Sequence, residues 1–105
     1  MARVIWSPQA LADLEAIGDY LAREAPAYAQ SFVDGAFGAV ERLAVFPRSG
    51  RAVPEIGDVA LRELIHRGYR IFHMVSDAEG ELEVEILSVF HATRQFGGDE
   101  GLELG

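Results

Sequence analysis

The side chains best suited to chemistry in this sequence are arginines and a histidine in its second half. Arginine binds carboxylates and phosphates through two parallel N–H groups, and histidine can transfer a proton near neutral pH. Arg70 lies inside an apolar, strand-like segment, and Arg94 follows His91 by three residues, which places a cation near a titratable ring. We therefore take Arg62, Arg70, His91 and Arg94 as candidate contacts to a target molecule.

Each of these residues also has a purely structural interpretation. The chain has 17 acidic residues, and a surface ion pair with one of them contributes only about 0–1 kcal/mol. We favour such a pair for Arg67. Arg70 is different because it lies beside Phe72 and Met74, where a solvated charge has no evident use. His91 can equally be a structural hydrogen-bonding group.

Other kinds of site find little support in the sequence. His66, His73 and His91 lack the short spacing of paired histidine ligands, so we expect no metal. The absence of cysteine excludes disulfides, thiolate zinc sites and cysteine nucleophiles. No serine stands in an elbow motif and no glycine-rich phosphate loop is present, so we expect no cofactor.

The composition is that of one folded domain with an acidic surface. The 105 residues are 50% hydrophobic, and no apolar run approaches the length of a membrane span, about 18–20 residues. We expect a cytoplasmic protein without a membrane partner. The net charge of −8 divides into −4 over residues 1–41, +3 over 42–76 and −7 over 77–105. Because nucleic-acid affinity depends on neutralising phosphates, we expect no direct sequence-specific binding to DNA or RNA.

The elements that position these residues begin with a strand at 3–6 and two helices. Ser7 as N-cap and Pro8 at the first helical position start the first helix. Pro26 opens the second helix, and Pro47 ends it because a proline disfavours helical backbone at the preceding residue. Small residues inside both helices predict a closely packed antiparallel hairpin; they are Gly18, Gly35 and Gly38.

Three further strands are predicted at about 59–66, 69–76 and 82–91, after a loop over 48–58. Residues 77–80 form the turn between the last two strands. The order β-α-α-β-β-β predicts an α+β fold, with a helical hairpin packed on one face of a largely antiparallel sheet.

The second face of that sheet is expected to be apolar as well. Alternation along the strands places Phe72, Met74, Leu87 and Val89 on it. Because one helical hairpin covers only one face, we expect this second face to stay open and to bind another protein.

Several short motifs follow one another in a characteristic order and spacing, including Trp6-Ser7-Pro8-Gln9-Ala10, Leu61-Arg62-Glu63-Leu64, Tyr69-Arg70-Ile71 and Val89-x-His91-x-x-Arg94. Through these motifs the sequence, from about Val4 to Phe96, resembles the RelE/ParE superfamily of toxins from bacterial type II toxin–antitoxin pairs. We interpret residues 1–96 as one such domain and residues 97–105 as a flexible acidic tail.

The resemblance implies one of two activities. RelE-like members are ribosome-dependent mRNA nucleases, and their residues map here onto Glu55, Arg70 and His91. Their paired lysines, however, fall on Leu61 and Glu63, and further catalytic positions fall on Ala92 and Phe96. Without those cations the site loses stabilisation of the charge that develops on phosphate. The motifs are closer to ParE-like members, which bind and inhibit DNA gyrase.

The resemblance also implies a partner, a cognate ParD-like antitoxin that forms a hetero-oligomer with the toxin. We expect the antitoxin to lay a helix and an extended segment over the helical hairpin and the second sheet face. The residues expected to contact it are Leu14, Tyr20, Phe72, Met74, Leu87 and Val89.

Overall fold

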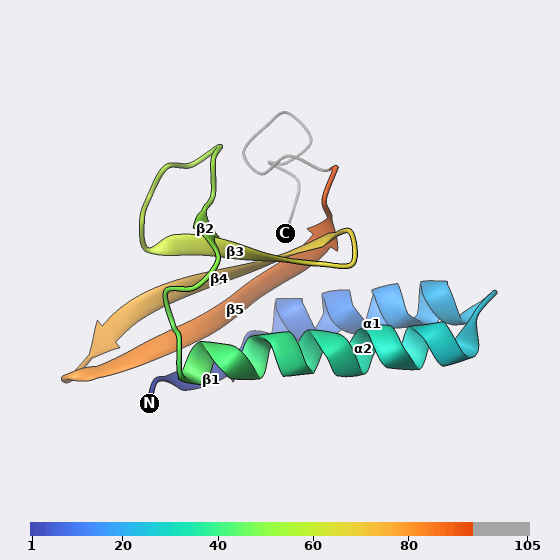
Figure 1. Cartoon of the computed structure of the whole chain (residues 1–105), viewed down its shortest axis with the longest axis horizontal. Coiled ribbons are helices and arrows are strands. Elements are labelled where there is room, and N and C mark those ends of the chain that lie inside the picture. The colour runs from blue at the N-terminus through green and yellow to red at the C-terminus, as the bar shows by residue number, and fades with distance from the viewer. Residues whose placement is uncertain (94–105) are drawn as a thin grey trace.

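The computed structural model describes residues 1–93, so Arg94, Phe96 and the predicted tail at 97–105 lie outside the described residues. Two helices pack on one side of a five-stranded sheet with the order β1-β5-β4-β3-β2 (Figure 1). Strand β1 runs parallel to β5, and the other neighbours are antiparallel, which confirms the predicted α+β fold. The strands are β1 (Arg3–Trp6), β2 (Arg51–Ala52), β3 (Leu61–His66), β4 (Tyr69–Ala78) and β5 (Glu81–His91). Strand β2 corrects the sequence analysis, which predicted a loop over 48–58.

The helices begin where their proline and capping residues predicted. Helix α1 (Pro8–Ala22) follows Ser7, whose hydroxyl oxygen accepts a hydrogen bond from the backbone N–H of Ala10 at 3.0 Å. Helix α2 (Pro26–Glu41) continues into a short 3₁₀ turn, η1 (Arg42–Ala44), and ends before Pro47. A methyl group added at Gly18 would lie 3.2 Å from the side chain of Val33, so the glycine permits the close approach of the two helices.

The main core lies between the helices and the sheet. The helices contribute apolar side chains at helical spacing, and the central strands β4 and β5 contribute side chains from one face, at every second position except across an irregularity in β5. Because both patterns bury one face, the sequence determines this side of the molecule well. The fully or almost fully buried members include Leu14, Phe32, Ala36, Val40, Ile71, Val84, Ile86 and Val89.

The position of Val89 corrects the predicted faces of β5. Phe72 pairs with Ser88 and His73 pairs with Ile86, so Leu87 has no partner on β4 and forms a β-bulge. An extra residue in one strand reverses the alternation beyond it. Val89 therefore faces the helices and is buried there, whereas the sequence placed it on the opposite face beside Leu87.

The second face of the sheet is partly covered by the chain itself. The segment between β2 and β3 lies on the side of the sheet away from the helices (Figure 1). Its Val53 is fully buried with Phe72 and Phe90 in a second, smaller apolar cluster, against which Met74 and Leu87 pack half-buried. The prediction of an open apolar face is therefore only partly correct: part of the predicted loop folds back over it, whereas Ile65, which pairs with Arg70, stays 55% exposed.

Candidate functional site

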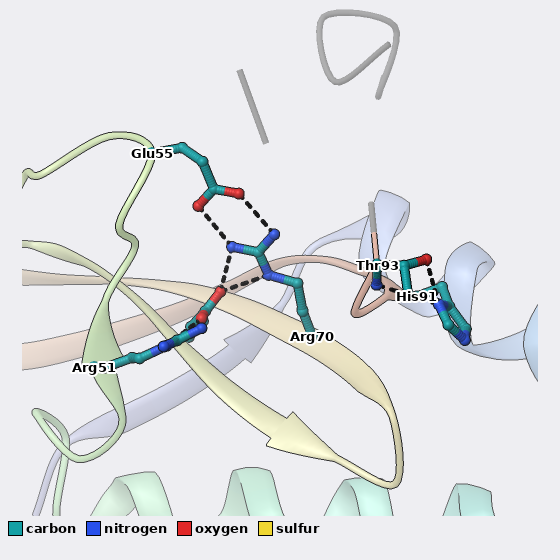
Figure 2. A network of polar contacts seen from close by, with 6 residues as sticks. Arg51, Glu55, Arg70, His91 and Thr93 are labelled. Carbon is teal, nitrogen blue, oxygen red and sulfur yellow. Dashed lines mark hydrogen bonds and ion pairs between the residues drawn. The ribbon is translucent and has the colours of Figure 1, made fainter. Parts of the chain in front are cut away.

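Arg70 lies in the central strand β4, on the face opposite the helices, and its guanidinium group is surrounded by aromatic rings and carboxylates. The carbon of the guanidinium lies 4.8 Å from the centre of the Phe72 ring and 5.9 Å from that of Phe90. Nη1 and Nη2 donate to the two carboxylate oxygens of Glu55, each at 2.9 Å (Figure 2). Arginine forms its strongest contacts in this two-pronged geometry. The Arg70 side chain is 5% exposed.

Glu63 joins this pair to a second arginine. Nε of Arg70 donates to Glu63 Oε1 at 2.7 Å, and Nε of Arg51 donates to Glu63 Oε2 at 2.6 Å. The Glu63 side chain is fully buried, whereas that of Arg51 is largely exposed. Two arginines thus balance two carboxylates. Hydrogen bonding to Glu55, and then to Glu63, raises the pKa of Arg70 against the opposing effect of burial.

Local backbone geometry holds Glu55 in place. Val53 is buried, and its carbonyl accepts hydrogen bonds from the N–H groups of Ile56 at 3.1 Å and Gly57 at 2.8 Å, which closes a tight turn around Glu55. Gly57 has a φ of +78°, a conformation that favours glycine. Gly50 also has a positive φ, and a side chain there would collide with the carbonyl oxygen of Glu63. These constraints hold the carboxylate of Glu55 within hydrogen-bonding distance of Arg70.

A shallow pocket of about 410 Å³ opens beside this network. Ala92, where RelE-like nucleases are expected to have a catalytic arginine, lines it with a methyl group. Leu61, one of the positions expected to be lysine, is buried in the second apolar cluster. Glu63, the other, is an anion bound to Arg51 and Arg70. Within residues 1–93, the two arginines beside this pocket are therefore balanced by Glu55 and Glu63, which leaves no excess of positive charge there for binding phosphate.

His91 does not join Arg70. It is paired with Tyr69 at the end of β5, and its ring packs against the Tyr69 ring with centroids 5.3 Å apart. The Tyr69 ring in turn packs on Phe32 of α2, so His91 lies toward the helical side of the sheet. Nδ1 of His91 lies 2.8 Å from the hydroxyl of Thr93, and Figure 2 shows the ring directed away from Arg70. The sheet separates the two predicted residues because the bulge at Leu87 reverses the end of β5.

Arg62 and Arg67 also lie away from the network around Arg70, and Arg94 lies outside the described residues. Arg62 donates from Nη1 to the carbonyl of Val59 at 3.0 Å. Arg67, in the β3–β4 turn, donates to the hydroxyl of Ser31 at 3.0 Å and lies 5.5 Å from the ring centre of Tyr28. Arg67 therefore binds α2 rather than an acidic side chain.

The residues expected to contact an antitoxin differ in accessibility. Tyr20 is 62% exposed on α1. Met74 and Leu87 are half-buried, whereas Leu14, Phe72 and Val89 are buried within the chain. Leu11 and Phe37 are exposed and border a groove between the helices.

Residues 4–96 match the sequence profile of a family described as "ParE toxin of type II toxin-antitoxin system, parDE". The chain belongs to the ParE toxin family. It is 37% identical over 95 residues to "Toxin RelE2" of Caulobacter vibrioides, an alignment that covers 90% of this chain and 99% of that protein. The ParE-family chain is therefore a toxin of a type II toxin–antitoxin system, which implies an antitoxin partner.

Two solved structures share the fold of this ParE-family chain. One, described as "Chromosomal ParDE TA system from P. aeruginosa", superimposes with a TM-score of 0.69 at 23% identity and covers 87% of this chain and 96% of its own. The other, "YoeB/ParE toxin from Agrobacterium tumefaciens", gives 0.57 at 17% identity and covers 85% and 97%. None of the helices among the described residues is long and apolar enough to cross a membrane.

Proposed function

We propose that this ParE-family chain inhibits DNA gyrase by binding to it, and that a cognate ParD-like antitoxin neutralises it. The proposed contacts to gyrase are Arg62, His91 and Arg94, while Arg70 holds the segment between β2 and β3 against the sheet. Tyr20, Met74 and Leu87 are proposed as contacts to the antitoxin, because they remain partly accessible in the isolated chain.

The observation that carries the proposal is that carboxylates already occupy the guanidinium group of Arg70. A nuclease of this superfamily needs its arginine free to stabilise charge on the scissile phosphate. Here Glu55 and Glu63 occupy the guanidinium, and His91 lies on the other side of the sheet. Binding to a protein needs none of these groups to meet, so it fits the arrangement better than RNA cleavage does.

A gyrase assay tests the proposal directly. The full chain, released from its antitoxin, is titrated into a reaction in which gyrase supercoils relaxed plasmid DNA. We expect the supercoiled product to disappear as the toxin is added and to return when the antitoxin is added back. Supercoiling that stays unchanged at a large molar excess of folded toxin would refute the proposal.

A second candidate is ribosome-dependent mRNA cleavage. It is favoured by the 37% identity to the Caulobacter vibrioides protein named "Toxin RelE2". Primer extension on ribosome-bound mRNA separates the candidates. Cleavage that is lost in Arg70→Lys and kept in the surface variant Arg67→Lys would support the nuclease and contradict gyrase inhibition as the activity.

A further inference from the structure

The end of β5 brings a hydroxyl group and an imidazole ring together, apart from the network around Arg70. Nδ1 of His91 lies 2.8 Å from the hydroxyl oxygen of Thr93, and the backbone N–H of Thr93 donates to the same Nδ1 at 3.2 Å (Figure 2). Both residues are exposed. A hydroxyl and a base within hydrogen-bonding distance of each other are the two groups that covalent chemistry at a threonine requires.

The direction of these contacts identifies which group donates the proton. A ring nitrogen that accepts a hydrogen bond from a backbone N–H carries no proton itself, so the proton of the neutral His91 ring is on Nε2. The contact of 2.8 Å is therefore a hydrogen bond from the Thr93 hydroxyl to Nδ1. In this arrangement Nδ1 is placed to accept the hydroxyl proton when the oxygen attacks an electrophile.

The ring of His91 is held in this position by its neighbours. It packs edge to face against the ring of Tyr69, with an angle of 76° between the ring planes. The Tyr69 ring packs in turn on the fully buried Phe32, with centroids 5.2 Å apart. A base that is already oriented before the reaction loses less freedom in the transition state, so this packing favours proton transfer from Thr93.

The exposed hydroxyl of Ser31 on α2 provides a contrast within the same chain. Its oxygen accepts a hydrogen bond from Nη1 of Arg67 at 3.0 Å, and within residues 1–93 no imidazole or carboxylate accepts its proton. A cation withdraws electron density from a hydroxyl oxygen, whereas a base that accepts the proton makes the oxygen more nucleophilic. The surroundings therefore favour reaction at Thr93 over Ser31, although a serine hydroxyl is the less hindered of the two.

Charge restricts the electrophiles that can approach Thr93. This residue lines the edge of the pocket beside Arg70, where two arginines are balanced by two carboxylates. The chain as a whole has a net charge of −8, which repels a nucleoside triphosphate or another polyanionic donor but not an uncharged ester. Lysine and cysteine, which compete for activated acyl groups in most proteins, are absent from the sequence.

We propose that Thr93 is an acylation site, at which the hydroxyl reacts with small, uncharged, activated esters and His91 acts as the general base. The Thr93 oxygen forms a bond to the acyl carbon while its proton moves to Nδ1 of His91. The bond between the acyl carbon and the leaving oxygen then breaks, and the leaving group takes up that proton. The products are an acylated Thr93 and a free alcohol or phenol. This activity goes beyond the proposed inhibition of gyrase and does not depend on it.

Acetylation by p-nitrophenyl acetate tests the proposal. The full chain is incubated with the ester near neutral pH, and mass spectrometry of the intact protein and of its peptides locates the acetyl group. We expect acetylation of Thr93 and none of Ser31. Thr93→Val, which keeps the shape of the side chain and removes the hydroxyl, should lose this modification. An acetyl group on Ser31 as readily as on Thr93, or none on Thr93, would overturn the proposal.

A second variant tests the base. His91→Gln keeps a polar side chain but has no group that accepts a proton near neutral pH, so acetylation of Thr93 should slow by about 100-fold. Circular dichroism confirms that both variants are folded. An unchanged rate in folded His91→Gln would refute the role of the imidazole. The comparison of Thr93 with Ser31 is made within the wild-type chain, so it decides the case even where a variant fails to fold.

Discussion

The two faces of the sheet are closed in different ways. On one face, two helices bury a continuous apolar cluster that includes Phe32, Ile71 and Val84. On the other face, a short segment covers a small apolar cluster, and buried charges on Arg70 and Glu63 hold that segment through Glu55. Apolar burial tolerates small changes in geometry, whereas a buried ion pair requires both partners. The second face should therefore be far more sensitive to single changes of charge.

The largest effect should follow from Glu63→Ala. It leaves Arg70 buried with one carboxylate partner fewer, and the loss of one member of a buried ion pair costs about 3–5 kcal/mol. Urea denaturation at neutral pH measures the change in the free energy of unfolding. The combined variant Glu63→Leu/Arg70→Met, which removes charge from both members of this pair, should be much more stable than Glu63→Ala. Equal losses in both proteins would contradict the dependence on paired charge.

Two glycines of α2 provide a matched test of the helical face. A methyl group at Gly35 would lie 2.8 Å from Cε1 of His66, whose ring is held by a contact of 3.0 Å between Nε2 and the carbonyl of Phe32. We expect Gly35→Ala to destabilise the chain by about 1–3 kcal/mol through overpacking. Gly38 has no such neighbour among the described residues, so Gly38→Ala should stabilise it by up to about 1 kcal/mol. If the thermal unfolding temperatures of Gly35→Ala and Gly38→Ala shifted in the same direction, this difference would be contradicted.

His73 should make stability depend on pH. It is fully buried, and burial lowers its pKa, with the positive charge of Arg62 acting in the same direction. The unfolded chain then binds a proton more readily than the folded one, so this contribution to stability is lost as the pH falls below about 6.5. Urea denaturation at several pH values should show that the free energy of unfolding falls less at acidic pH for His73→Leu than for the wild type. Parallel curves for the two proteins would show that His73 does not contribute.

The smallest effect is expected at an exposed ion pair. Nη2 of Arg3 donates to Glu83 Oε2 at 2.6 Å, but the Arg3 side chain is largely exposed. Water and salt screen such a pair, and the flexible side chains lose freedom when they form it. The unfolding midpoint of Glu83→Ala should stay close to that of the wild type. A loss comparable to that of Glu63→Ala would remove the distinction between buried and exposed charge.

The sequence predicted the helical face well because its signals are local. Ser7, Pro8 and Pro26 specify where the helices begin whatever the remainder of the chain does. The arrangement of the second face depends on contacts between residues far apart in the sequence, which no local signal marks. The bulge at Leu87 reverses the end of β5, and no turn residue marks it.

The candidate site was only partly predictable for the same reason. Arg70 was recognised as unusual because of its apolar neighbours, and Glu55 was recognised from the family resemblance. Their pairing depends on how residues 53–57 fold back over the sheet, and the contribution of Glu63 depends on the register between β3 and β4. The structure separates His91 from Arg70 through a change of one residue in strand pairing, which alternation alone does not reveal.

We propose that carboxylates close the surface around Arg70 to phosphate and that this toxin acts through contacts with proteins. Fluorescence anisotropy with a short single-stranded RNA, at physiological salt, tests it most directly. We expect no saturable binding to the wild-type chain up to about 100 µM, the weak limit of ordinary non-specific binding. Saturable binding at micromolar concentration that is lost in folded Arg70→Lys would contradict the account.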